Sequence, residues 1–385
     1  MMCEQAARRV AMGLLSALVA VTGAFGLSAA EAEGVERISS DKGAMLEATA
    51  LAEFDEPWAM SFLPDGRMLV TTKPGELFLV TESGDRTEVS GLWKVAYGGQ
   101  GGLGDVVPHP DFATNRWVYI SNAEEGRGGR GAVLRRAKLV ESGGKARLED
   151  AEVIWTQVPK VRSGRHYGHR IAFGPDGMLY VTSSDRGERP LAQRFDNHLG
   201  KVLRLHEDGR VPEDNPWRGK GDIAKSFWSM GHRNILGIAF DAEGRLWTNE
   251  MGPRHGDEIN LTLRGSNQGW PEVSMGDHYS GAAIPDHSAR DGFNPPEAFW
   301  VPSIAPSSLI IYQGAVFGGW GGDAVITGLV SGALIRVDIE GDKAREIDRF
   351  DFGARLREVE EGPDGALFVL EDGDGGRLLK LAPAN

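Results

Sequence analysis

The sequence predicts an all-β fold, a six-bladed β-propeller, and three observations support this prediction. Of the 385 residues, 53 are glycine, about twice the usual share, which is typical of a chain with many tight turns. A turn followed by a short alternating or apolar strand recurs six times along the chain. No convincing amphipathic helix separates the copies, and radial repetition of small sheets is the simplest architecture with these features.

Three of the six copies, at residues 62–70, 173–181 and 361–369, contain the same turn sequence Pro-Asp-Gly, and the others vary it. Proline presets φ, aspartate caps the turn, and glycine takes the position of positive φ before the strand begins. The fifth copy has the weakest pattern, and a pair of β-sandwiches with coincidental turns is the alternative architecture. A propeller also explains how residues 33–385 can form a single domain. The copies occupy residues 62–70, 110–119, 173–181, 240–247, 321–326 and 361–369.

Residues 1–32 are predicted to be a signal peptide rather than part of the fold. A pair of arginines gives a positive start, residues 10–27 are apolar and uncharged, and cleavage after Ala30 or Ala32 satisfies the rule of small residues before the cut. The alternative is a retained membrane anchor, although no other apolar run approaches the roughly 20 residues that span a bilayer. We expect a periplasmic or secreted protein with no stable membrane insertion after processing.

The composition excludes two classes of site. The net charge of -13 argues against nucleic acid as a partner, because phosphate contacts need clustered Lys and Arg. The single cysteine, Cys3, precedes the predicted cleavage point, so the sequence offers no disulfide framework and no cysteine-based zinc site.

Polar side chains recur at similar distances before the predicted turns. In a propeller the innermost strands of all blades line a central channel, so these side chains should converge at one end of it. For any one of them, an ordinary surface position is the plainer interpretation, but the shared spacing favours a common site. The set consists of Gln100, His166, Arg233, Asn234, Arg355 and Arg357.

His166 has the clearest predicted partner. A hairpin centred on Pro175 and Asp176 would place Asp185 opposite His166. A carboxylate beside an imidazole fixes its tautomer and raises its basicity, which suits a general base. His169, three residues further on, is expected to face the opposite side of the strand and to have a structural role.

A second hairpin, centred on Ala242 and Glu243, would place Gly252 opposite Arg233. Gly252 and Pro253 would free backbone carbonyls from regular strand pairing, and Asp257 and Glu258 add carboxylates nearby. Oxygen ligands of this kind suit Ca²⁺ better than Zn²⁺, although the spacing is not that of an EF-hand loop.

Seven motifs occur in an order that resembles one family. They are residues 99–103, 168–177, 231–237, 250–260, 267–271, 302–308 and 355–359. Together they resemble the soluble PQQ-dependent aldose sugar dehydrogenases and, more distantly, soluble glucose dehydrogenase. The resemblance runs from about Leu51 to Leu381 and implies a six-bladed propeller.

The resemblance also implies a function. A family member uses PQQ and Ca²⁺ to oxidise the C1 hydroxyl of an aldose sugar to a lactone, and electrons then pass to a quinone or cytochrome. His166 corresponds to the general base, Asp185 to the carboxylate that orients it, and Gln100 to a residue beside the substrate. The residues that correspond to cofactor-binding positions are Arg233, Asn234, Ser303, Arg355 and Arg357.

Two calcium sites are implied by the same resemblance. Gly252 and Pro253 correspond to the carbonyls that bind the Ca²⁺ shared with the cofactor. Glu258 and the carbonyl of Gln268 correspond to parts of a second, structural Ca²⁺ site, whose other ligands the sequence does not indicate.

One position departs from the family pattern. The family usually has a lysine in contact with the cofactor where this chain has Val330. The loss of a charge-assisted contact is worth roughly 1.5 to 3 kcal/mol. Arg254 and Arg186 are the candidates that could replace this charge.

Two other functions remain open at this point. A propeller that binds sugar or another ligand without redox chemistry is favoured by Val330, whereas the His166–Asp185 pair argues against it. A calcium-dependent hydrolase of the lactonase type would need carboxylates around a central metal. The predicted channel positions carry arginine, glutamine and histidine instead.

The N-terminal segment yields the first prediction. N-terminal sequencing of the exported protein should show a chain that begins after Ala30 or Ala32, because the apolar segment is followed there by small residues. An intact Met1 on a membrane-bound product would contradict this prediction.

Overall fold

The computed structural model describes residues 34–384, so the predicted signal peptide lies outside the described residues. The chain divides into two units, Met1–Glu33 and Gly34–Asn385, and the description concerns the second. Nearly all regular structure in it is β. The helices are one α-helical turn, α1 (Phe112–Asn115), and three 3₁₀ turns, η1 (Arg189–Gln193), η2 (Arg218–Lys220) and η3 (Ala224–Ser226).

The described strands form five sheets. Three of them are four-stranded antiparallel sheets with the strands in sequence order. Their strands are β11 (Gly168–Phe173), β12 (Leu179–Ser183), β13 (Lys201–Leu205) and β14 (Phe227–Met230); β15 (Ile235–Phe240), β16 (Leu246–Glu250), β17 (Asp257–Leu261) and β18 (Ala298–Trp300); and β19 (Pro306–Ile311), β20 (Ala324–Gly328), β21 (Ala333–Glu340) and β22 (Lys343–Asp351).

The fourth sheet has eight strands and contains two antiparallel runs that meet where β6 pairs with β10 in parallel. In spatial order its strands are β3 (Pro57–Phe62), β4 (Met68–Thr72), β5 (Glu76–Val80), β6 (Arg86–Ser90), β10 (Lys145–Thr156), β9 (Gly129–Ser142), β8 (Trp117–Gly126) and β7 (Leu103–Pro108). The fifth sheet contains, in order, β1 (Val35–Ser39), β2 (Met45–Phe54), β25 (Gly376–Pro383), β24 (Leu367–Glu371) and β23 (Leu356–Glu361).

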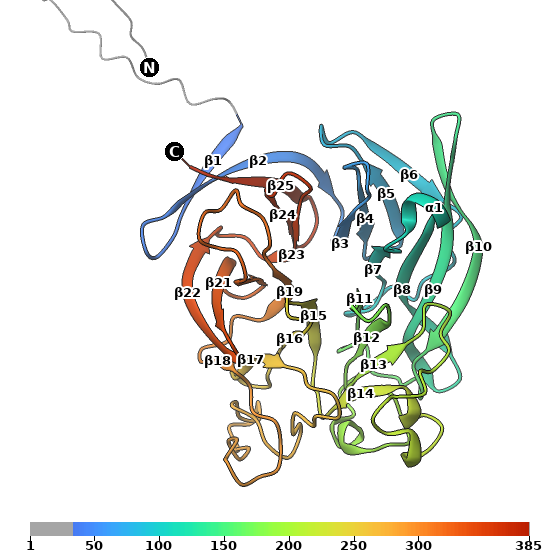
Figure 1. The fold of residues 1–385 in the computed structure, drawn as a ribbon, viewed down its shortest axis with the longest axis vertical. Coiled ribbons are helices and arrows are strands. Elements are labelled where there is room, and N and C mark those ends of the chain that lie inside the picture. Colours follow the sequence, from blue (N-terminus) through green and yellow to red (C-terminus); the bar gives the residue numbers. More distant parts are fainter. Residues whose placement is uncertain (1–33, 385) are drawn as a thin grey trace, which may run out of the picture. The chain divides into compact units, whose positions relative to one another are not determined.

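The sheets surround a central axis (Figure 1). Six strands lie closest to this axis, and each contacts the next, so they form a closed ring in the order β3, β7, β11, β15, β19, β23 and back to β3. The arrangement is that of a β-propeller, as the repeated turn–strand pattern predicts.

Each sequence repeat falls between a ring strand and the strand that follows it. The aspartates act as predicted, because the side chains of Asp65, Asp176, Asp241 and Asp364 each accept a hydrogen bond from a backbone N–H two residues later. Only the second repeat forms a helical turn instead, α1, within the described part of the chain.

A register shift recurs near the start of every ring strand. In each of the six hairpins the pairing moves by one residue within the first few residues of the ring strand. In the third hairpin the shift lies between Gly168 and Ile171, and Gly168 pairs with Ser183. Continued outwards, this register brings His166 opposite Asp185, as the sequence predicts. A bulge of this kind bends the strand and redirects its side chains.

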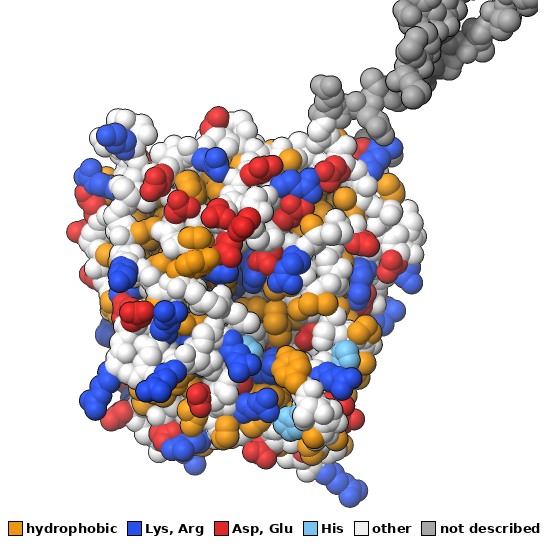
Figure 2. Space-filling view, turned by 180° about the vertical axis from the view of Figure 1, so that it is seen from behind, with side chains coloured by type: hydrophobic (Ala, Val, Ile, Leu, Met, Phe, Trp, Pro, Cys, Tyr) orange, Lys and Arg blue, Asp and Glu red, His pale blue; other side chains and the backbone are white. Residues whose placement is uncertain are grey.

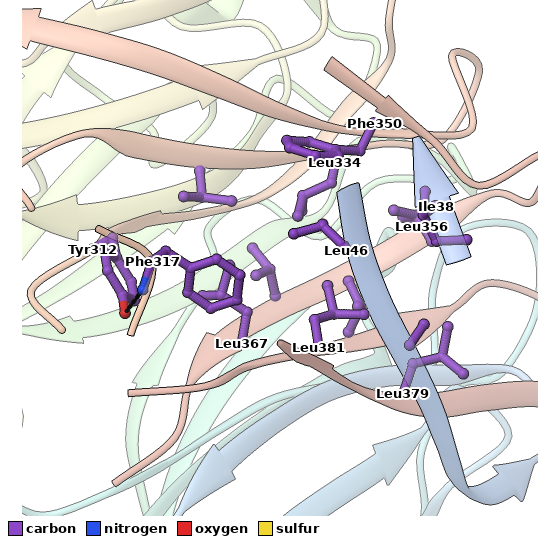
Figure 3. Close-up of a cluster of buried hydrophobic side chains, with 14 of the residues drawn as sticks. Ile38, Leu46, Tyr312, Phe317, Leu334, Phe350, Leu356, Leu367, Leu379 and Leu381 are labelled. Atoms are coloured by element: carbon purple, nitrogen blue, oxygen red, sulfur yellow. Dashed lines mark hydrogen bonds between the residues drawn. The ribbon is translucent and has the colours of Figure 1, made fainter. Parts of the chain in front are cut away.

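The N-terminal and C-terminal strands close the ring. β2 pairs with β25 along its length, so the fifth sheet contains both ends of the described chain. Between this sheet and the β19–β22 sheet lies a large apolar cluster (Figure 3). Leu46, Leu379 and Leu381 from the closing strands are all at least 98% buried there. Burial of these side chains stabilises the closed ring.

The outer surface is mixed in character. Figure 2 shows one face on which acidic and basic side chains are interspersed and hydrophobic side chains gather near the middle. None of the helices in residues 34–384 has the length and apolar character that a membrane span requires.

The ring closure yields a second prediction. Leu381→Ala should lower the free energy of unfolding by about 2 to 5 kcal/mol, because the removed atoms leave a cavity in the apolar cluster between the fifth sheet and the β19–β22 sheet. Urea denaturation followed by tryptophan fluorescence measures this. Lys380→Ala in the same strand is the control and should cost about 1 kcal/mol or less, since it removes a surface ion pair with Asp364. Equal costs for the two changes would mean that the closing strands do not stabilise the ring through this cluster.

Candidate functional site

A cavity of about 370 Å³ opens where the ring strands begin. Gln100 precedes β7, Asn234 precedes β15, and Arg355 and Arg357 lie at the start of β23; all four line the cavity. The ring strands belong to sheets far apart in sequence, so the fold brings these predicted residues together. Trp58, Tyr167, His169 and Met251 form much of the apolar lining.

His166 and Asp185 form the predicted pair. Nδ1 of His166 lies 2.7 Å from Oδ1 of Asp185, and both side chains are at least 90% buried. Because Asp185 accepts the proton on Nδ1, the imidazole has its other nitrogen, Nε2, as the acceptor. The backbone N–H of His166 donates to Oε1 of Gln100 at 2.6 Å, which connects the pair to the cavity wall.

Trp270 completes the surroundings of Asp185, and the sequence did not single it out. Its indole N–H donates to Oδ2 of Asp185 at 2.8 Å, while the N–H of Gly187 donates to Oδ1. Burial acts to raise the pKa of Asp185, but the hydrogen bond and charge of His166, the N–H of Gly187 and the charge of Arg233 together outweigh it, and the pKa lies below its usual value. Asp185 therefore stays ionised and fixed in position.

The environment of His166 favours the neutral imidazole. Burial lowers its pKa below the usual value, and the nearby positive charges of Arg233 and Arg165 act in the same direction, whereas Asp185 opposes them. An imidazole that is neutral at neutral pH can accept a proton from a substrate.

The prediction that His169 has a structural role rested on strand alternation, which does not hold here. His166 and His169 both adopt positive φ, at 53° and 56°. His169 lines the cavity, whereas His166 is connected to its wall through Gln100. The ring of His169 stacks on Trp58 with centroids 5.1 Å apart, and Nδ1 lies 2.7 Å from Oγ of Ser121. Burial lowers the pKa of His169 to about 3, so the ring remains neutral.

Arg233 and Asn234 lie between the cavity and a second, smaller pocket. The guanidinium of Arg233 donates to the carbonyl of Met251 at 2.7 Å and lies over the ring of Trp270. Its Nε and Oδ1 of Asn234 are buried without a hydrogen-bond partner. Burying a polar atom without a hydrogen-bond partner costs free energy, and a polar ligand that bonded to these two atoms would remove that cost.

Arg355 and Arg357 share one carboxylate. Both donate to Asp372, at 2.8 Å from Nε of Arg355 and 2.6 Å from Nη2 of Arg357. Burial lowers the pKa of Arg357, while Asp372 acts against this shift. Asp372 lines the cavity and keeps both guanidinium groups oriented towards it.

Three residues lie where they do not suit the roles that the sequence suggested for them. Ser303 does not line the cavity; Ala305 does, and the N–H of Ser303 instead donates to His255. Arg186 is fully buried and donates to the carbonyls of Arg130, Ser163 and Arg165, so it cannot replace the charge missing at Val330. Arg254 is exposed and lies outside the cavity lining, while Val330 itself is on the cavity wall.

The smaller pocket collects the predicted calcium ligands. Gly252, Pro253, Glu258 and Gln268 line it, so the residues assigned to two sites surround one pocket. Burial raises the pKa of Glu258 well above its usual value, and the nearby carboxylate of Glu250 adds to this effect. Two buried carboxylates side by side provide a place for a cation. No group of three or more His, Cys, Asp or Glu side chains in residues 34–384 is arranged to hold a metal.

Carboxylates also occur in the channel, at positions that the sequence did not indicate. Asp105 and Glu358 lie further along the ring strands, and both pair with Nη1 of the buried Arg170. Burial raises the pKa of Glu358 to about 7. Because Arg170 pairs with both carboxylates, this group differs from a carboxylate-lined metal centre.

The chain is similar to known proteins over most of its length. The family model described as glucose/sorbosone dehydrogenase matches residues 54–380. The aldose sugar dehydrogenase YliI of Escherichia coli is 38% identical over 341 residues, which cover 86% of this chain and 91% of that protein. The crystal structure of the soluble Escherichia coli aldose sugar dehydrogenase in its apo form superposes with a TM-score of 0.83 at 36% identity, covering 88% of this chain and all of that one.

A structure with cofactor is also similar. The PQQ-bound form of an aldose sugar dehydrogenase from Streptomyces coelicolor superposes with a TM-score of 0.72 at 28% identity, covering 88% of this chain and 98% of that one.

The contact between Trp270 and Asp185 yields a third prediction. Trp270→Phe should lower the free energy of unfolding by about 1 to 3 kcal/mol beyond the effect of lost ring volume, because Oδ2 of a buried carboxylate loses its donor. Chemical denaturation of Trp93→Phe gives the control. Trp93 donates to Asn122, but Arg135 still donates to the same oxygen after the change. Equal losses for the two variants would show that Trp270 contributes only its volume.

Proposed function

Because the chain belongs to the glucose/sorbosone dehydrogenase family, we propose that it is a PQQ- and Ca²⁺-dependent dehydrogenase that oxidises aldose sugars at C1. The observation that carries the proposal is the His166–Asp185 pair, set beside a cavity that several arginines border. The relatives named above are sugar dehydrogenases, and the similarity covers most of both chains. The product would be a lactone, and a quinone or cytochrome would accept the electrons.

The cavity suits a planar, anionic cofactor. Its volume of about 370 Å³ lies within the range of small-molecule sites. Asn234 and Arg233 present buried polar atoms without partners, and Arg355 and Arg357 provide guanidinium groups for carboxylates. We propose that these four side chains hold PQQ, and that Ser303 contributes less because it lies off the cavity.

The smaller pocket suits Ca²⁺. Calcium takes six to eight oxygen ligands, and carbonyls and carboxylates both serve. The carbonyls of Gly252, Pro253 and Gln268, with the carboxylate of Glu258, would supply several of them. Gly252 has no room for a side chain, because an added Cβ would lie 2.1 Å from the carbonyl oxygen of Gly256. The close packing of this loop therefore requires glycine.

His166 would act as the general base. Its Nε2 takes the proton of the C1 hydroxyl while the hydrogen on C1 leaves as hydride, so that a C1=O bond forms. Bound PQQ supplies the two-electron acceptor for that hydride. The carboxylate of Asp185 holds the ring in the correct tautomer and stabilises the imidazolium that forms.

Neighbouring side chains would keep this geometry. Trp270 and Gly187 fix Asp185, and the amide of Gln100 fixes the backbone of His166 while facing the substrate space. Arg233, whose carbonyl accepts a hydrogen bond from the N–H of Asp185, links the base to the cofactor side of the site. Positioning of this kind lowers the entropic barrier of the reaction.

Two further statements belong to the proposal. We infer six blades, with the eight-stranded sheet as two four-stranded blades joined by the parallel contact between β6 and β10. The closed ring of six inner strands supports this count. We also propose export to the periplasm or the exterior, on the basis of the N-terminal sequence.

Reconstitution tests the proposed function. Purified apoprotein is mixed with PQQ and Ca²⁺, and reduction of an artificial dye is followed with a panel of aldoses. Turnover that requires both additions supports the proposal. Binding of sugar without PQQ binding or dye reduction would favour a non-redox propeller, the function that Val330 supports. Hydrolysis of lactones without PQQ would favour the hydrolase.

The base yields a fourth prediction. His166→Gln should lower kcat by about two to four orders of magnitude, the usual contribution of general base catalysis, with PQQ affinity nearly unchanged. His169→Gln is the matched control for activity and should have a much smaller effect. If His169→Gln abolished turnover and His166→Gln did not, the assignment of the base would be wrong.

The pH profile distinguishes the role of Asp185. In the wild type kcat should rise as His166 loses its proton, with a midpoint below the usual histidine value because burial lowers this pKa. Asp185→Asn removes a charge that raises the pKa of His166, so the midpoint should move to still lower pH while the maximal kcat falls. A midpoint that moved to higher pH would contradict this electrostatic role.

A further inference from the structure

Lys73, Glu56 and Tyr97 form a charged group at the cavity that the mechanism above does not use. Nζ of Lys73 lies 2.9 Å from Oε1 of Glu56, and the hydroxyl of Tyr97 donates to Oε2 of the same carboxylate at 2.8 Å. Lys73 and Glu56 both line the cavity, and each side chain is about one-fifth exposed. The amino group therefore reaches both the cavity and solvent.

The backbone of Lys73 is held in a fixed position. It directly follows β4, its N–H donates to the carbonyl of Glu56, and its own carbonyl accepts from the N–H of Leu103 at the start of β7. Gly102 packs so closely that an added Cβ would lie 2.0 Å from the carbonyl oxygen of Lys73. The flexible part is thus the side chain alone, which is the part that would meet a ligand.

Lys73 and Val330 line the same cavity, and a series of hydrogen bonds connects the segments that carry them. The N–H of Glu56 donates to the carbonyl of Gly373, the N–H of Asp372 donates to the carbonyl of Arg355, and the Arg355 guanidinium donates to the carbonyl of Leu329. Leu329 and Val330 line the cavity together with Lys73. A continuous series of contacts therefore connects the lysine to the position where the sequence resemblance would place one.

The cationic side chains that line the cavity differ in the strength of their ion pairs. Asp372 engages both Arg355 and Arg357, whereas Lys73 has one carboxylate partner, Glu56. If the ammonium turned towards a ligand, Glu56 would keep its hydrogen bond from Tyr97. A partly exposed ion pair of this kind is weak, so a ligand carboxylate can compete for the lysine.

We propose that Lys73 binds a carboxylate of the cofactor and so supplies, from the turn between β4 and β5, the positive charge that this chain lacks at Val330. The proposal rests on the proposed function, because it takes PQQ as the ligand. An ammonium on a four-carbon stem can reach such a group as a point charge, without the fixed geometry that a guanidinium requires.

A double-mutant cycle tests the proposal. Apoprotein with saturating Ca²⁺ is titrated with PQQ, and quenching of tryptophan fluorescence gives Kd for the wild type, Lys73→Met, Val330→Lys and the double variant. Lys73→Met should weaken binding about ten- to a hundredfold. Val330→Lys should change the wild type little but should restore most of the affinity in the Lys73→Met background, because the two positions would then be interchangeable.

Two controls accompany the cycle. Lys94→Met removes an exposed lysine that does not line the cavity, and it should leave Kd unchanged. Thermal unfolding of each apoprotein shows whether Lys73→Met acts through folding rather than through binding. A Kd that falls back into the wild-type range on adding Val330→Lys is not expected from a purely structural defect at Lys73.

The outcomes separate the two proposals. If the wild type binds PQQ and Lys73→Met binds equally well, the role of Lys73 is refuted while the proposed function stands. Equal tightening by Val330→Lys in both backgrounds would also refute it, since the two sites would then act independently. Failure of the wild type to bind PQQ would refute both proposals.

Discussion

The closure of the ring by β2 and β25 is the constraint on which the rest of the structure depends. Each sheet contacts mainly its two neighbours, so the six inner strands hold their positions only while the ring is closed. The closing pair joins the first and last parts of the described chain and buries its leucines in a shared cluster. A cavity lined from β4, β23 and the segments before β7, β11 and β15 can exist only in the closed form.

The repeated register shift shapes the end of the ring where the cavity lies. A regular strand would direct alternate side chains to opposite faces, but a bulge near the start of each ring strand redirects the residues there. His166 and His169 show the effect, since both adopt positive φ. His169 lines the cavity, and His166 lies against its wall at Gln100. Such backbone conformations are costly for residues other than glycine, and they tend to occur at functional sites.

The charged side chains around the cavity occur in paired groups. Asp372 holds Arg355 and Arg357, Glu56 holds Lys73, and further along the ring strands Asp105 and Glu358 hold Arg170. Pairing keeps each cation oriented and limits the cost of burying it. Nε of Arg233, Oδ1 of Asn234, the hydroxyl of Tyr167 and Nη2 of Arg170 are among the buried atoms without a hydrogen-bond partner in the described residues. Those of Arg233 and Asn234 mark a place where a polar ligand would satisfy the site.

The all-β fold, the position of the repeated turns, the His166–Asp185 pair and four residues of the cavity lining, Gln100, Asn234, Arg355 and Arg357, could be predicted from the sequence. These features depend on local rules: turn chemistry, strand pairing across a short hairpin, and motifs contiguous in the chain. The sequence did not reveal Trp270 as the donor to Asp185, although the residue lies in a recognised motif, because the contact joins loops of different sheets.

Which side chains line the cavity together could be seen only in the folded structure, because they come from different sheets. Arg186 and Arg254 looked equally able to replace the charge missing at Val330, yet one is buried among backbone carbonyls and the other lies outside the cavity. No sequence pattern indicated a binding role for Lys73, because lysine is a common residue at the end of a strand. Lys73 and Val330 line one cavity because the closed ring brings the sheet that contains β4 next to the sheet that leads to Asp372, and no local pattern in the chain encodes this arrangement.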